Sequence, residues 1–112
     1  MTNALDVLGD PVRRRILELL ADGELSSGAI VDVIRDEFGI SQPAVSQHLR
    51  VLRESGLVAS KPEGARRLYT IEAAKLHDVD RWLAQFRPMW ESRLDALGEE
   101  IERGKRRRKP KR

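Results

Sequence analysis

The sequence contains no cysteine, and this absence excludes several kinds of chemistry at once. A chain without cysteine has no disulfide framework, no thiolate metal site and no cysteine nucleophile. The chain also lacks any run of about 18 consecutive apolar residues, which a membrane-spanning helix needs. Residues 1–6 show neither the basic patch nor the apolar stretch of a secretory signal, so we expect a cytoplasmic protein that enters no membrane.

Histidine is scarce as well, since His48 and His77 are the only two in the chain. Neither histidine lies in a sequence context that indicates an activated nucleophile or a metal-bound water. We therefore expect no catalytic residues and no enzymatic activity.

The net charge of +3 conceals an uneven distribution of basic residues. Eight of the 21 Lys and Arg residues fall within residues 103–112, so the other 102 residues carry 13 basic and 18 acidic side chains. Any nucleic-acid surface on this acidic body must come from local clustering of basic side chains. We expect residues 1–102 to form one folded domain and residues 103–112 to form a basic, disordered tail.

Capping residues predict where the first two helices lie. Residues 3–8 are expected to form a short helix. Asp10 has the side chain of an N-cap, and Pro11 after it fits the first helical position, where its missing N–H costs nothing. The second helix is expected to end just before Gly23.

The next segment has the pattern of a helix-turn-helix. A third helix over residues 27–38, capped by Ser26 or Ser27, is followed by Gly39 and then by a fourth helix over 42–55 capped by Ser41. The short turn forces the two helices to cross. Apolar residues at helical spacing are expected to face inward: Ile30, Ile34 and Phe38 in the third helix, and Val45, Leu49 and Leu52 in the fourth.

Two β-capable runs follow, residues 57–61 and 66–71, and the Pro/Gly segment 62–65 between them predicts a hairpin. A long helix over residues 75–102 is expected next, with a continuous apolar stripe and a kink or break near Arg87 caused by Pro88. The predicted fold is therefore mainly α with a small β-hairpin: a winged helix-turn-helix with five helices and a two-stranded wing.

The outward face of the 42–55 helix is polar. It carries Gln42, Ser46, Gln47, Arg50 and Arg53, and Gln and Arg are the side chains that make bidentate contacts with adenine and guanine. An ordinary solvated helix face is the alternative, but the preceding turn and the following hairpin favour DNA reading. Basic residues of the hairpin, Arg66, Arg67 and Lys61, suit phosphate or the minor groove, although a protected edge strand would also carry such charges.

Three stretches together resemble the ArsR-type winged helix-turn-helix regulators: Leu8–Leu17, Ser41–Leu52 and Glu63–Tyr69. The resemblance covers about residues 4–101 and places the chain in a cysteine-free branch. It implies a repressor, or an autorepressor, that binds an inverted-repeat operator as a homodimer through its first and last helices. The DNA-binding residues would be Ser41, Gln42, Ser46, Gln47, His48, Arg50, Arg66 and Arg67. The dimer interface would contain Leu5, Leu8, Leu76, Val79, Leu83, Phe86, Trp90, Leu94 and Leu97.

The resemblance also directs attention to metals. Ser26 and Gly28 stand where related sensors carry cysteine, and neither residue can supply a soft thiolate ligand. A second type of site in the family would use His77 with Asp78 or Asp80, but a solvated helix start explains that stretch better. The aromatic residues near Trp82 suit a dimer core better than a cofactor pocket. We therefore expect no metal and no cofactor.

Three alternatives remain open at this stage. The basic tail would suit a nonspecific nucleic-acid-binding or nucleoid-associated protein. The acidic body would suit a protein-interaction module that has lost DNA binding. A regulator could also respond to an unidentified protein co-regulator or to a hard metal such as nickel or zinc.

Overall fold

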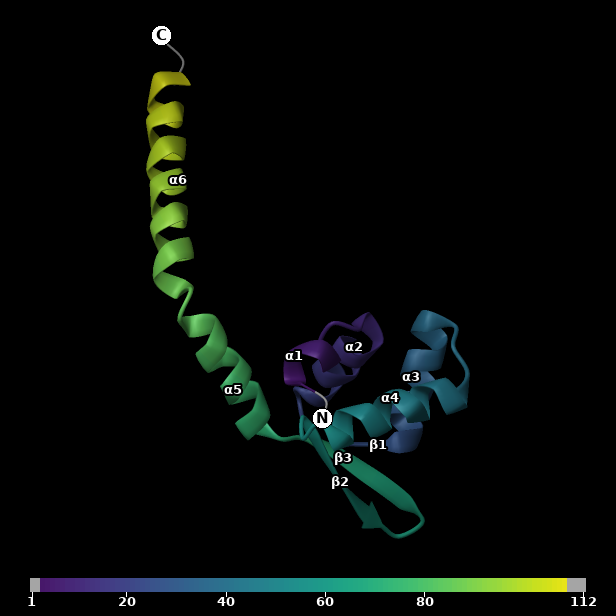
Figure 1. Ribbon diagram of the computed structural model, residues 1–112. Coiled ribbons are helices and arrows are strands. Elements are labelled where there is room, and N and C mark those ends of the chain that lie inside the picture. The colour runs from purple at the N-terminus through teal and green to yellow at the C-terminus, as the bar shows by residue number, and fades with distance from the viewer. Residues whose placement is uncertain (1–2, 109–112) are drawn as a thin grey trace. The chain divides into compact units, whose positions relative to one another are not determined.

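The computed structural model describes residues 3–108, with side chains as far as residue 104, and the chain divides after Val79 into two compact units. The described residues form six helices and one three-stranded antiparallel sheet. The elements are α1 (Ala4–Val7), α2 (Pro11–Leu20), β1 (Leu25–Ser26), α3 (Ser27–Phe38), α4 (Gln42–Glu54), β2 (Val58–Glu63), β3 (Arg66–Ile71), α5 (Ala73–Ala84) and α6 (Arg87–Arg108). Figure 1 shows their arrangement along the chain.

Local capping explains where α2 begins. The Asp10 carboxylate accepts hydrogen bonds from the backbone N–H groups of Val12 and Arg13, at 2.8 and 3.2 Å. Pro11 occupies the first turn, as the sequence predicts. The side chains of Arg13 and Arg14 then donate to the carbonyls of Val7 and Leu8 and so tie α1 to α2.

The helix-turn-helix is confirmed, and its turn depends on caps at both ends. Ser26 is the residue that caps α3, since its hydroxyl accepts from the N–H of Ala29 at 3.2 Å. Gly39 ends that helix at a φ of 66°, in the left-handed region that glycine adopts without steric cost. Ser41 caps α4 and accepts from the N–H of Ala44 at 3.3 Å.

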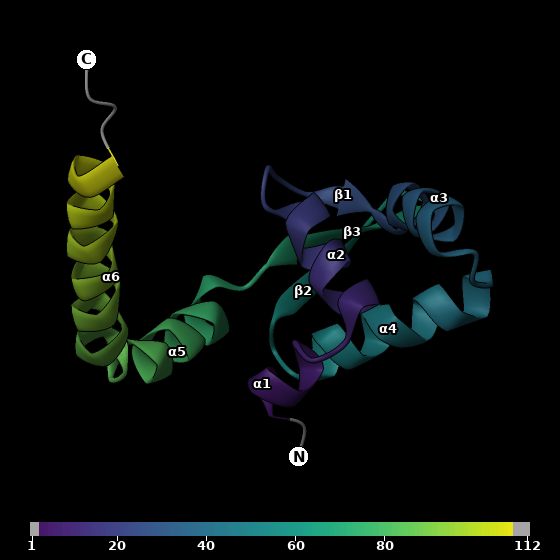
Figure 2. The ribbon, with the colours of Figure 1, turned by 90° about the horizontal axis from the view of Figure 1, so that it is seen from above.

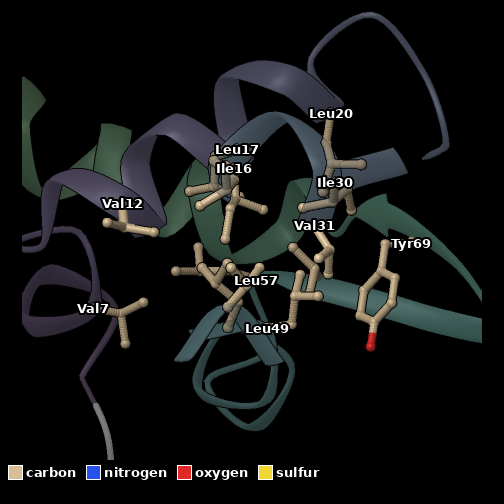
Figure 3. Close-up of a cluster of buried hydrophobic side chains, with 14 residues drawn as sticks. Val7, Val12, Ile16, Leu17, Leu20, Ile30, Val31, Leu49, Leu57 and Tyr69 are labelled. Carbon is tan, nitrogen blue, oxygen red and sulfur yellow. The ribbon is translucent and has the colours of Figure 1, made fainter. Parts of the chain in front are cut away.

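The core of the first unit lies between α2, α3, α4 and the sheet, where apolar side chains of these elements meet (Figure 3). Ile16, Ile34, Leu52 and Leu57 are fully buried there. The inward position predicted for Phe38 is wrong, because this side chain is 38% exposed at the last residue of α3. An ion pair on the surface adds to the packing of α2 on α3: the guanidinium of Arg15 donates to both carboxylate oxygens of Glu37, at 2.8 and 2.9 Å.

The sheet contains one strand more than the sequence predicted. The wing strands β2 and β3 pair as expected, and β1 adds to the other edge of β3, with Leu25 opposite Tyr69. Pro62 is tolerated because β2 is an edge strand. Gly64 turns the hairpin at a φ of 61°, and Figures 1 and 2 show the three strands together with α1–α4.

The predicted single helix over residues 75–102 is two helices. α5 ends at Ala84 and α6 begins at Arg87, which confirms the break expected from Pro88 and raises the number of helices from five to six among the described residues. α6 continues to Arg108, so residues 103–108 are helical, whereas their composition predicts a disordered tail. Lys and Arg are good helix formers, and no proline interrupts them before Pro110. Residues 109–112 lie outside the described part of the chain.

Candidate nucleic-acid interface

The outward face of α4 is exposed along its whole polar row. Gln42, Ser46 and Gln47 are all exposed, while Val45 and Leu49 on the opposite side are buried in the core. The buried side of the helix therefore fixes how α4 is rotated. Its N-terminal half presents amide and hydroxyl groups to solvent.

Arg50 lies one turn further along α4 and is also exposed, at 63%. Its Nε donates to Oε1 of Glu54 at 3.0 Å, which makes an ion pair between residues one helical turn apart. An exposed pair of this kind stabilises a fold only weakly, so its consequences concern the orientation of the guanidinium.

His48 and Ser41 differ from the other candidate residues. His48 is half-buried, and its Nδ1 is buried without a hydrogen-bond partner among the described residues. Ser41 uses its hydroxyl as the helix cap. Ser41 therefore lies at the start of the exposed row, and His48 lies at its inner edge.

Asp10, the cap of α2, lies within electrostatic reach of His48. Partial burial alone would raise the pKa of Asp10. The N–H donors of Arg13 and Val12, with smaller electrostatic contributions from His48 and Arg13, outweigh that effect and hold the pKa below its ordinary value. Asp10 therefore stays ionised at neutral pH while it caps α2.

The wing carries the basic side chains that the sequence indicated, and each has a partner in the chain. Nη2 of Arg66 lies 3.4 Å from Glu63, across the hairpin turn. Nη1 of Arg67 donates to the hydroxyl of Ser60 at 2.9 Å, from one wing strand to the other. Lys61 lies 3.7 Å from a carboxylate oxygen of Glu24.

An open groove of about 440 Å³ joins α4 to the wing and to the start of α3. The groove brings Ser46 together with both arginines of the wing. Ser27 also lines the groove, although the sequence indicates this residue only as a possible cap of α3. The lining residues are Ser27, Ser46, Leu49, Pro62, Gly64, Ala65, Arg66, Arg67 and Tyr69.

The residues expected at a dimer interface have two kinds of environment. Leu5, Leu83, Phe86, Leu94 and Leu97 are exposed apolar side chains, between 37% and 62% accessible. Leu8, Leu76, Val79 and Trp90 are half-buried, and Leu8 and Leu76 pack against the core of the chain itself. Phe86 makes an edge-to-face contact with Trp82 at a centroid distance of 5.0 Å.

The described residues include no cluster of three potential metal ligands from His, Asp or Glu, and His77 and Asp78 are exposed. None of the described helices combines the length and the apolar character required to span a membrane.

A helix-turn-helix whose second helix shows a polar face, followed by a basic hairpin, defines a winged helix-turn-helix DNA-binding regulator. Residues 10–60 match the family described as "Bacterial regulatory protein, arsR family". The chain belongs to this arsR family.

Relatives and solved structures agree with this assignment. The HTH-type transcriptional regulator Rv2034 of Mycobacterium tuberculosis is 38% identical, over 87% of this chain and 91% of that protein. The transcriptional repressor SdpR of Bacillus subtilis is 31% identical, over 77% of this chain and 91% of that protein. A crystal structure described as a possible transcriptional regulator for arsenical resistance is 35% identical with a TM-score of 0.63, over 89% of this chain and 97% of that one. The chain is therefore a DNA-binding transcriptional regulator and not an enzyme.

Proposed function

We propose that this chain is a repressor that binds an inverted-repeat operator as a homodimer. The observation that carries the proposal is the shared groove, in which the exposed face of α4 meets Arg66 and Arg67 of the wing. A helix at this position suits the major groove, and a basic hairpin beside it suits the adjacent backbone. Repression is supported by the similarity to SdpR, which is a transcriptional repressor. Since its partner is DNA, the protein would act in the cytoplasm.

The exposed residues divide by chemistry into two roles. Gln42, Ser46, Gln47 and Arg50 would contact base edges, because amides and guanidinium groups match the donor and acceptor patterns of adenine and guanine. The wing residues Arg66 and Arg67 would contact phosphates, which fix position without reading sequence. Ser41 and His48 would support α4 from its cap and its inner edge and contact phosphate where they are accessible.

The second copy of the chain would cover the apolar residues that the single chain leaves exposed. Leu94 and Leu97 lie three residues apart on α6, and Leu83 is exposed near the end of α5. Large apolar side chains left exposed in this number on a monomer indicate an interaction site. A two-fold dimer would present two copies of α4 to DNA. Its half-sites would lie about 34–36 Å apart, one helical turn of the duplex.

The experiment begins by selecting bound fragments of the source genome to obtain the operator. Affinity for this operator and for a scrambled duplex is then measured for Gln47→Ala and Arg50→Ala. Each variant is expected to lose about 1–3 kcal/mol on the operator and much less on the scrambled duplex. Arg93→Ala removes the same charge from an exposed position of α6 and serves as the matched control. Equal losses on both duplexes would mean that these side chains hold phosphate only, and base reading by α4 would be wrong.

A further inference from the structure

The pair between Arg50 and Glu54 has a geometry that sets it apart from the other ion pairs of the interface. Glu54 accepts from Nε of Arg50, the inner nitrogen of the guanidinium, at 3.0 Å. The two terminal nitrogens of Arg50 make no hydrogen bond to any described residue. The two terminal nitrogens of the guanidinium therefore keep all their N–H donors for a ligand.

The wing arginines hold their partners differently. Arg66 uses Nη2 for Glu63, and Arg67 uses Nη1 for Ser60. Each therefore uses an N–H of one terminal nitrogen within the chain. A bidentate contact with guanine uses two N–H donors of one guanidinium, directed at O6 and N7 of the base. Of these three arginines, Arg50 is the one whose terminal fork is fully available in the structure described.

We propose that Glu54 is a positioning residue for base recognition: by holding Nε of Arg50, it presents the two terminal nitrogens as a fixed fork to a guanine of the operator. The proposal rests on the proposed function of α4. An arginine side chain loses considerable rotamer freedom when it is fixed on a base. A carboxylate that already restrains the guanidinium lowers this cost for a contact that requires one orientation.

Glu54 is expected to weaken the contacts of Arg50 with phosphate, whereas it favours the contact with a base. A phosphate accepts a guanidinium in many orientations, so a fixed fork brings little advantage in binding random DNA. The negative charge of Glu54 also repels the duplex and competes with phosphate for Arg50. Loss of this carboxylate is therefore expected to strengthen random binding while it weakens the preference for the operator.

The test compares Glu54→Ala and Glu54→Gln with the unmodified chain on the selected operator and on a scrambled duplex, at physiological salt. The matched control is Glu91→Ala, because Glu91 forms an exposed pair with Arg87 at the same spacing along α6. Glu54→Ala is expected to lower the ratio of operator to scrambled affinity about five- to tenfold, at the lower end of what one bidentate base contact contributes. Scrambled-DNA affinity is expected to rise about twofold, consistent with the weak coupling of exposed charges.

Two further comparisons separate positioning from a general charge effect. Glu54→Gln keeps an oxygen that accepts from Nε, so it is expected to retain most of the ratio although it has lost the charge. In an Arg50→Ala background, Glu54→Ala is expected to lower the ratio no further. Glu91→Ala is expected to leave the ratio unchanged, and thermal unfolding monitored by circular dichroism confirms that each variant is folded.

The outcomes separate the base contact of Arg50 from the positioning role of Glu54. If Arg50→Ala lowers the ratio and Glu54→Ala does not, Arg50 reads a base without help and the positioning role is wrong. The positioning role is also overturned if Glu54→Gln loses as much as Glu54→Ala, because the charge alone would then explain the effect. If Arg50→Ala itself leaves the ratio unchanged, both the base contact of Arg50 and the role of Glu54 are wrong.

Discussion

Replacement of Asp10 tests how the start of α2 supports the helices that carry the interface. The carboxylate accepts two backbone N–H groups, at 2.8 and 3.2 Å, which would otherwise lack partners at the helix N-terminus. Asp10 is half-buried, so solvent compensates only in part for the loss of these bonds. Asp10→Ala removes the acceptor, whereas Asp10→Asn keeps an oxygen that can cap the helix.

The size of the effect follows from the cap. Loss of an N-cap acceptor costs about 0.5–2 kcal/mol, and two donors to a charged group place Asp10 in the upper half of that range, about 1–2 kcal/mol. For a unit of this size the midpoint of thermal unfolding would fall by about 5–15 °C. Asp10→Asn is expected to lose less than half as much at neutral pH. Asp78→Ala, at an exposed position of α5, is the matched control.

The pH dependence gives the prediction its sign. The folded pKa of Asp10 lies below its ordinary value of 3.8, because the bonds to the N–H groups of Arg13 and Val12 outweigh the effect of burial. The charge of Asp10 therefore stabilises the fold above that ordinary value, and this contribution is lost as the pH falls through the folded pKa. The stability gap between the unmodified chain and Asp10→Asn should close at acid pH.

The assay is urea unfolding followed by circular dichroism at several pH values and one protein concentration, since the stability of the proposed dimer would depend on concentration. A stability gap between the unmodified chain and Asp10→Asn that widens as the pH falls would mean that the charge of Asp10 does not stabilise the fold. So would an Asp10→Ala variant that is as stable as Asp78→Ala.

Further predictions concern assembly, the tail, the wing and metals. The double variant Leu83→Glu and Trp90→Glu is expected to sediment as monomer or aggregate. A native-like monomer of the unmodified chain at micromolar concentration would contradict the homodimer. Deletion of residues 103–112 is expected to weaken operator and random binding by similar factors and to flatten the salt dependence, and a loss confined to the operator would show that the tail reads sequence. Arg66→Ala and Arg67→Ala are expected to weaken both duplexes evenly. Arsenite is expected not to bind in calorimetry, because the chain has no cysteine, and tight binding would refute that expectation.

Much of the first unit could be predicted because its helix boundaries are set by local chemistry. Asp10 with Pro11, Ser41 and Gly39 each act within a few residues of their own position, and the structure places the helix ends there. The exposed row of α4 could be found for the same reason, since the buried Val45 and Leu49 fix the opposite face.

The features that were missed depend on distant or competing interactions. β1 has only two residues, Leu25 and Ser26, and it becomes a strand because Leu68 and Tyr69 pair with it from far along the chain. No alternating pattern of that length can signal a strand. The fork of Arg50 was likewise not predictable in detail, since the choice of Nε by Glu54 is a matter of side-chain geometry.

The continuation of α6 to Arg108 could not be predicted because the basic composition and the helix propensity of this stretch point in opposite directions. The basic residues from Arg103 indicated disorder by composition, yet Lys and Arg favour the helix. The exposed position of Phe38 is a similar case, because its spacing from Ile34 fits the stripe but it stands at the last residue of α3, beyond the packed core.

Whether α4 recognises one DNA sequence is measured by the ratio of the chain's affinities for the operator and for a scrambled duplex at physiological salt. Base reading by α4 requires a ratio of at least about a thousand, the lower bound for specific regulators. The same titration with both duplexes at several salt concentrations separates the charge contribution from base reading. A ratio near one would mean that α4 does not read sequence and would favour a nonspecific nucleic-acid-binding protein.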